Sequence, residues 1–331
     1  MRPFDAAARL GPAVARINPA AVRVADALES AGASIGVHAS RLPCGARLID
    51  AGVEWPGSLE AARLYAEACL GGLGEVRVGV RTLGPAAIME ARVEVDAPLV
   101  SCLGSQYAGW KVQAGRFFAM GSGPARAVRA AEPLFERWPL KAPTGPTVLL
   151  LECDRLPGDD VGEAVAAACG TQPSTLTLIA AATGSITGSV QVASRSVETA
   201  MHKLAEIGFD VVRVLAGTGS CPVAPGHPDT LRAIGRTNDA VLYGAEVCLW
   251  VEAPDEAIDA IIDRVPSSAS REHGRLFHDL LKEHGDFYRI DPLLFSPARV
   301  TLINAATGKV FAAGRTDEGT LLRSFGLGPG K

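Results

Sequence analysis

The sequence has no long apolar run and few aromatic residues. Phe, Trp and Tyr make up 5% of its 331 residues. No stretch reaches the roughly 18 consecutive apolar residues that a membrane-crossing helix needs. The first 28 residues carry four Arg and no apolar run long enough for the core of an export signal. We therefore expect a cytoplasmic protein without a membrane partner.

The cysteines do not pair in the sequence. There are seven, an odd number, and none belongs to a C-x-x-C motif. They are Cys44, Cys69, Cys102, Cys153, Cys169, Cys221 and Cys248. This spacing argues against a disulfide scaffold or a zinc ribbon. It favours a reduced protein that uses Cys as a small core residue.

Several functional signatures are also missing. The net charge of −4 argues against the basic surface that a dedicated nucleic-acid-binding protein needs. His273, His278 and His284 are five and six residues apart, so one helix face cannot hold all three. No G-x-S-x-G or H-E-x-x-H motif occurs. We expect neither a nucleic-acid partner nor a metal site.

Core-forming residues are abundant, since 48% of the chain is hydrophobic. At roughly 150 residues per domain, the length predicts two domains. The Pro- and Gly-containing segment 140–146 is the best candidate linker, which predicts domains at 1–143 and 144–331. An interleaved arrangement of the two domains stays open.

The apolar periodicity predicts an α+β fold of mixed α/β layers. Helices are expected at 5–29, 58–70 and 187–207, and strands at 75–80 and 89–95. The segment 236–253 alternates like a strand, and 298–314 has the pattern of a hairpin.

One Gly-rich segment with aromatic residues is a candidate for ligand binding. It contains Gln106, Tyr107 and Trp110, and then Gly121-Ser122-Gly123-Pro124 before a short helical stretch that includes Arg126. A strand followed by a Gly-rich turn and a helix start can bind an anion through outward-pointing N–H groups. An ordinary glycine turn, with aromatic side chains in the core, is the structural alternative.

The predicted helix 187–207 carries the most informative polar residues. Gln191, Arg195, Glu198 and His202 form one stripe at helical spacing. Arg195 and Glu198 are three residues apart and can touch. By itself, this spacing is typical of a solvent-exposed ion pair. The functional alternative is a carboxylate base held and tuned by an arginine.

Five ordered motifs together resemble methenyltetrahydromethanopterin cyclohydrolases. They are DAGVEWPGSLEAARLYAEACLGGLGEV, SQYAGW, FFAMGSGPARA, GSVQVASRSVETAMHKL and PVAPGHPDTLRAIGRTNDAVLYGAEV. One position differs from the family pattern, because Ser194 stands where a small apolar residue is expected.

The resemblance implies a fold and an activity. It implies two α/β-type domains with a substrate pocket between them, a homotrimer, and no metal or redox cofactor. It also implies hydrolytic, reversible ring opening of 5,10-methenyltetrahydromethanopterin to the 5-formyl form in one-carbon metabolism.

The resemblance further implies that Arg195 and Glu198 are the catalytic residues. The candidate substrate-binding residues are Gln106, Tyr107, Trp110, Ser122, Gly123, Arg126, Gln191, Asn238, Asp239 and Tyr243. Two other functions stay open. One is a related enzyme acting on methenyltetrahydrofolate, and the other is a pterin-binding protein without turnover.

Overall fold

A computed structural model describes residues 6–285 and 289–327. The chain divides into two compact units that interleave. Unit 1 comprises Met1–Glu75 and Leu99–Gly188, and unit 2 comprises Val76–Pro98 and Ser189–Lys331. The fold is mixed α/β, as expected, with one six-stranded sheet in each unit.

The units do not divide at residue 143. Segment 140–146 instead lies inside unit 1, between α4 (Leu134–Arg137) and β7 (Thr147–Glu152). The chain changes unit at residues 75/76, 98/99 and 188/189. The cause is the hairpin of β3 (Gly74–Leu83) and β4 (Ala86–Val95), because β4 also pairs with β9 (Val214–Pro222), far later in the chain, and so adds the hairpin to the sheet of unit 2.

The sheet of unit 1 has the order β1-β2-β8-β7-β6-β5. Its three central strands β2, β8 and β7 are parallel, and the outer pairings are antiparallel. The other strands are β1 (His38–Arg41), β2 (Arg47–Asp50), β5 (Trp110–Ala114), β6 (Phe117–Ser122) and β8 (Leu176–Ala181).

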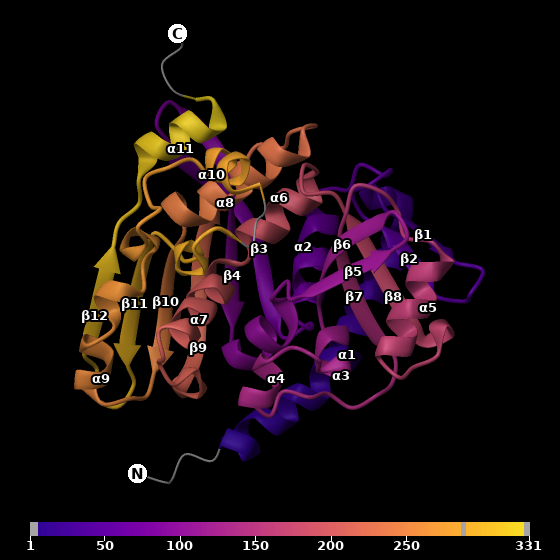
Figure 1. The fold of residues 1–331 in the computed structure, drawn as a ribbon, viewed down its shortest axis with the longest axis horizontal. Helices are drawn as coiled ribbons and strands as arrows, with labels where there is room; N and C mark the ends of the chain where they lie inside the picture. The colour runs from indigo at the N-terminus through magenta and orange to yellow at the C-terminus, as the bar shows by residue number, and fades with distance from the viewer. Residues whose placement is uncertain (1–5, 286–288, 328–331) are drawn as a thin grey trace. The chain divides into compact units, whose positions relative to one another are not determined.

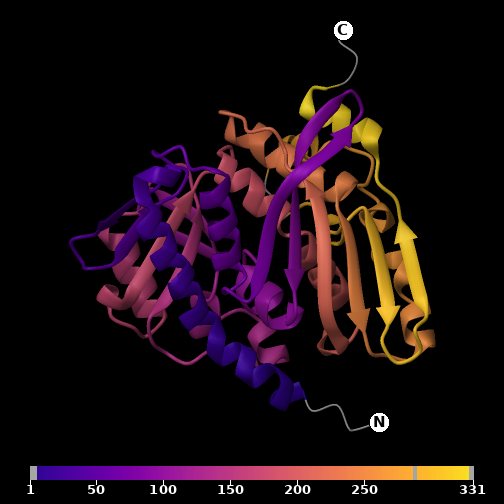
Figure 2. The same cartoon turned by 180° about the vertical axis from the view of Figure 1, so that it is seen from behind.

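Helices cover both faces of this sheet (Figures 1 and 2). On one face, α1 (Ala6–Ala31) and α2 (Leu59–Cys69) pack on Val148, Leu150 and Ile179 in a closed apolar core. Ser58 begins α2, as predicted, by accepting the N–H of Ala61 at 3.1 Å. The other face is covered by α5 (Asp159–Ala168).

Unit 1 also contains three shorter elements. They are the π-helix η2 (Leu99–Gln106), α3 (Ala125–Arg129) and the 3₁₀-helix η1 (Gly32–Ile35). Every residue of η2 is buried. A π-helix is rare and often marks a functional site.

The sheet of unit 2 has the order β12-β11-β10-β9-β4-β3. Its remaining strands are β10 (Glu246–Val251), β11 (Arg299–Asn304) and β12 (Val310–Gly314). β10 and β11 are parallel, whereas β11 and β12 form the antiparallel hairpin predicted at 298–314. Its principal helices are α7 (Ser196–Glu206), α8 (Thr230–Gly244), α9 (Asp255–Asp259), α10 (Phe277–His284) and α11 (Glu318–Phe325).

One predicted strand of unit 2 is a helix over half of its length. The first half of segment 236–253 belongs to α8, a 15-residue helix that Asp229 caps by accepting the N–H of Arg232 at 2.8 Å. Only Glu246–Val251 forms a strand. The apolar residues of 241–251 continue from the buried end of the helix into the strand. The helical period of 3.6 residues and the strand period of two are therefore hard to tell apart in this segment.

Candidate functional site

The predicted helix 187–207 is broken in the middle. It forms α6 (Ile186–Ala193) and α7, separated by Ser194 and Arg195. The hydroxyl and the N–H of Ser194 both donate to the Val190 carbonyl, at 2.8 and 2.9 Å. Such a bond from a serine hydroxyl to the preceding turn bends helices. Arg195 has φ −86° and ψ 7°, in the sparsely populated bridge region where active-site residues are common.

The break places Glu198 in the first turn of a new helix. α7 begins at Ser196, and its first-turn acidic residue is Glu198. The N–H groups of a first helical turn have no partner within the helix and carry a partial positive charge. The negative charge of a carboxylate is attracted to this end of a helix.

Arg195 and Glu198 are both buried, with exposed fractions of 9% and 4%. Nη1 of Arg195 lies 3.8 Å from Oε2 of Glu198, within ion-pair range but beyond hydrogen-bond length. The alternative of a solvent-exposed ion pair is therefore wrong for this pair. Nε of Arg195 also donates to Oε1 of Gln191 at 3.0 Å. The structure thus brings together three of the predicted site residues.

Two further basic side chains of α7 lie close to this group in sequence. His202 stands one turn after Glu198, and burial lowers its imidazole pKa. Lys203 is buried, and the same desolvation lowers its pKa to about 8. Its Nζ donates to the carbonyl of Leu293. The low pKa values favour the neutral forms of both side chains more than in water.

The other predicted group lies in unit 1, where β5, β6 and η2 meet. Trp110 pairs with Gly121 across the β5–β6 hairpin, and its ring lies under the guanidinium of Arg129 at 4.4 Å. Ser122 and Gln106 are buried, whereas Tyr107 is partly exposed. The structure therefore brings the unit 1 candidates together around one hairpin.

The predicted anion-binding turn instead binds the protein's own backbone. The N–H of Gly123 donates to the Ser105 carbonyl at 2.8 Å. Gly123 needs its φ of +99°, and a Cβ there would lie 2.5 Å from Cδ1 of Leu150. The following helix α3 has only five residues. This turn holds the end of η2.

Arg126 is fully buried, and it also holds the end of η2. Its Nη1 donates to the carbonyls of Leu103 and Ser105, at 3.1 and 2.9 Å. Its Nε and Nη2 donate to the two carboxylate oxygens of Glu132. Four of the five N–H groups of the guanidinium are thus used inside unit 1. The structure gives Arg126 a structural role rather than the predicted contact with an anion.

Glu132 is a partner that the sequence did not reveal. It stands six residues after Arg126, beyond the end of α3. Neither helical nor strand periodicity connects the two positions.

The three predicted site residues on α8 also have structural partners. Asp239 accepts the N–H of Phe277 at 2.9 Å and the hydroxyl of Ser324 at 2.6 Å. Burial raises its pKa to about 7. The Tyr243 hydroxyl donates to the Arg275 carbonyl, and Asn238 donates to the Ile234 carbonyl. Asp239 and Tyr243, which are 1% and 0% exposed, anchor α10 and α11 instead of offering polar atoms to a ligand.

Within 6–285 and 289–327, no group of three or more His, Cys, Asp or Glu side chains is placed to hold a metal ion. His284 contacts Glu272, and His273 packs on the ring of Tyr243. No described helix combines the length and apolarity required for a membrane span.

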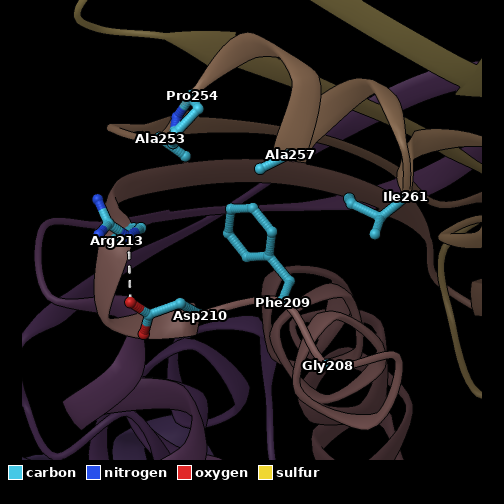
Figure 3. Close-up of a pocket in the computed structure, with 8 residues that line it drawn as sticks. All are labelled: Gly208, Phe209, Asp210, Arg213, Ala253, Pro254, Ala257 and Ile261. Atoms are coloured by element: carbon cyan, nitrogen blue, oxygen red, sulfur yellow. Dashed lines mark hydrogen bonds and ion pairs between the residues drawn. The ribbon is translucent and has the colours of Figure 1, made fainter.

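Unit 2 also has a small pocket of about 260 Å³ (Figure 3). Its lining is largely apolar, with Phe209 facing Ala257 and Ile261, and the ion pair of Asp210 and Arg213 at one side. The pocket follows the end of α7, whereas Glu198 lies in the first turn of that helix. Eight residues of α-helix rise about 12 Å, so this pocket does not contain the carboxylate.

Comparisons with known proteins decide the family. A family model described as Cyclohydrolase (MCH) matches residues 16–325. The chain belongs to this cyclohydrolase family.

Curated members of the family are similar over nearly their whole length. Methenyltetrahydromethanopterin cyclohydrolase of Rhodopirellula baltica is 47% identical, over 86% of this chain and 87% of that protein. The protein of the same name from Xanthobacter autotrophicus is 44% identical, over 98% and 95%. The protein of the same name from Methanothermobacter marburgensis is 39% identical, over 92% and 97%. The family predicted from the sequence motifs is confirmed.

Proposed function

We propose that this cyclohydrolase hydrolyses 5,10-methenyltetrahydromethanopterin reversibly to 5-formyltetrahydromethanopterin. Its relatives are named for this activity, and they match almost the whole chain. The observation that carries the proposal is the buried pair of Arg195 and Glu198 at the helix break. It supplies a carboxylate that is shielded from bulk water and has a cation beside it.

The chemistry accounts for both residue types. The methenyl carbon lies between two nitrogens and shares their positive charge. As the oxygen of water bonds to that carbon, Glu198 takes one of the water protons. When the bond between the carbon and one ring nitrogen then breaks, Glu198 delivers the proton to that nitrogen. The hydroxyl of the intermediate loses its own proton to solvent as its C–O bond becomes the formyl carbonyl, so one proton is released overall. The formyl group stays on the other nitrogen.

Arg195 has two candidate roles in this step. A carboxylate beside a cationic substrate stabilises the ground state, which by itself slows the reaction. Arg195 offsets this attraction and favours the ionised form of Glu198. Its Nη groups also suit the developing oxygen charge of the tetrahedral intermediate.

Gln106, Tyr107 and Trp110 are our proposed contacts for the pterin ring system. Tyr107 is the only one of the three that is partly exposed, and a tyrosine ring can stack on a pterin. Ser122 and Gly123 support this group, because the Ser122 hydroxyl contacts Sγ of Cys69 in α2 and the N–H of Gly123 holds the end of η2.

The proposed enzyme needs no metal or redox cofactor, because proton transfer and water addition use only side-chain acid–base chemistry. Treatment with a chelator should leave its rate unchanged. We place it in the cytoplasm, in one-carbon metabolism such as formaldehyde oxidation, and propose a homotrimer. One face of the unit 2 sheet supports an assembly with copies of this chain, because Trp250 and Val310 are 49% and 60% exposed on either side of Ile303.

The test follows the loss of the methenyl chromophore, with methenyltetrahydrofolate as a parallel substrate and an enzyme-free blank. We expect fast loss with the methanopterin carrier and much slower loss with the folate. Glu198→Gln should bind the substrate but lose at least about 100-fold in kcat. Faster turnover of the folate would favour the related folate enzyme. Tight binding without turnover would favour a binding protein.

A further inference from the structure

The hydrogen bond between Gln191 and Arg195 crosses the helix break. Gln191 is on α6 and Arg195 lies immediately before α7, and the bond joins Oε1 to Nε at 3.0 Å. Both side chains are buried, with exposed fractions of 2% and 9%. A bond of this length between buried groups restrains the guanidinium strongly, since its loss would leave a polar group unsatisfied.

We propose that Gln191 is a positioning residue, which fixes the guanidinium of Arg195 so that its Nη edge faces Glu198. This proposal rests on the proposed function. It replaces the expectation that Gln191 binds substrate. The geometry follows from the rigid, planar guanidinium: when Nε–H is bound on one side, the plane and the direction of the two Nη groups are set.

The neutral charge of the Gln191 amide is the second part of the proposal. Unit 1 provides a comparison, because the buried Arg126 is held by the carboxylate of Glu132 at Nε and Nη2. That partner neutralises Arg126. The amide of Gln191 orients Arg195 without neutralising it, so the positive charge still acts on Glu198 at 3.8 Å. Orientation and charge are thus supplied by separate residues.

Two substitutions of Gln191 separate these effects. Gln191→Glu keeps an acceptor of the same shape for Nε but adds a negative charge. The ionised form of Glu198 is then less favoured, and we expect the acid limb of the kcat profile to move up by about one pH unit. Gln191→Leu removes the acceptor. Arg195 then moves closer to Glu198, and the acid limb should move down by a similar amount.

Both variants should lose about 10- to 100-fold in kcat at neutral pH, with KM changed less than threefold. The matched control is Gln113→Glu, the same substitution at an exposed residue of β5, which should leave the profile unchanged. Opposite shifts in the two variants support a positioning role. Equal losses without a shift, or a large rise in KM with kcat unchanged, overturn it.

A measurement without turnover separates this proposal from the proposed function. Infrared difference spectroscopy during a pH titration reports carboxylate ionisation, and Glu198→Gln identifies the band of Glu198. If the enzyme shows no cyclohydrolase activity but the band shifts in opposite directions in the two variants, Gln191 positions Arg195 in a protein of another function. If the activity is present and the band does not move, the positioning role is wrong.

Discussion

Arg126 offers the sharpest test of how unit 1 is built. Replacement by Met keeps most of the volume but removes four hydrogen bonds, two to Glu132 and two to the carbonyls of Leu103 and Ser105. Removing one member of a buried ion pair costs about 3–5 kcal/mol, and the side chain of Glu132, which is 12% exposed, would keep a charge without compensation. We expect Arg126→Met to lower the free energy of unfolding by this amount.

The assay is urea denaturation followed by circular dichroism, combined with steady-state kinetics of any soluble variant. The double variant Arg126→Met/Glu132→Met should be about 2 kcal/mol more stable than the single variant, since it removes the uncompensated carboxylate. Both variants should lose kcat as well, because the bonds of Arg126 hold the end of η2 next to Gln106 and Tyr107.

The opposite pattern would refute this reasoning. If Arg126→Met unfolds within 1 kcal/mol of the wild type and KM rises more than tenfold, Arg126 is available to a ligand. The sequence-based prediction that Arg126 contacts an anionic part of the substrate would then be correct.

Three other predictions concern stability and assembly. Burial lowers the pKa of Lys203 from 10.5 to about 8. Between pH 8 and 10.5 the unfolded state therefore binds more protons than the folded state. The free energy of unfolding should rise with pH over this range by up to about 3 kcal/mol. Urea titrations at several pH values should show that slope in the wild type and not in Lys203→Met. Gly123→Ala should cost about 2–4 kcal/mol in thermal denaturation, from its φ of +99° and the contact with Leu150. Gly115→Ala, where φ is +52° and nothing lies within 4 Å, should cost about 1 kcal/mol. Trp250→Glu should convert the proposed trimer to monomer in light scattering, and an unchanged mass would exclude this face from the interface.

The sequence predicted the elements whose signals are local. Ser58 caps α2 through a side chain three residues from its partner, and the strands of the β11–β12 hairpin are joined by a short turn. Local sequence signals could not predict the division of the chain into units. It depends on the pairing of β4 with β9, more than 100 residues later in the chain, and no pattern near residue 143 contains that information.

The candidate site shows the same limit at the level of single residues. Two of the candidate site residues are arginines, Arg126 and Arg195, and both are buried. What separates them is the partner of the guanidinium, a carboxylate from a later segment in one case and an amide from the preceding turn in the other. Motif resemblance implied a catalytic role for Arg195, but only the contacts give Arg126 its structural role.

The helix break connects the local sequence to the proposed chemistry. A continuous helix would place Arg195 and Glu198 on one stripe, but Glu198 would then lie in a helix interior, where all N–H groups are bonded within the helix. The bonds of Ser194 to Val190 accompany a bend, after which the chain starts a new helix at Ser196. Glu198 gains the field of a helix N-terminus in addition to that of Arg195. Both effects favour an ionised carboxylate in a buried position, where burial alone would favour the protonated acid that cannot accept a proton from water.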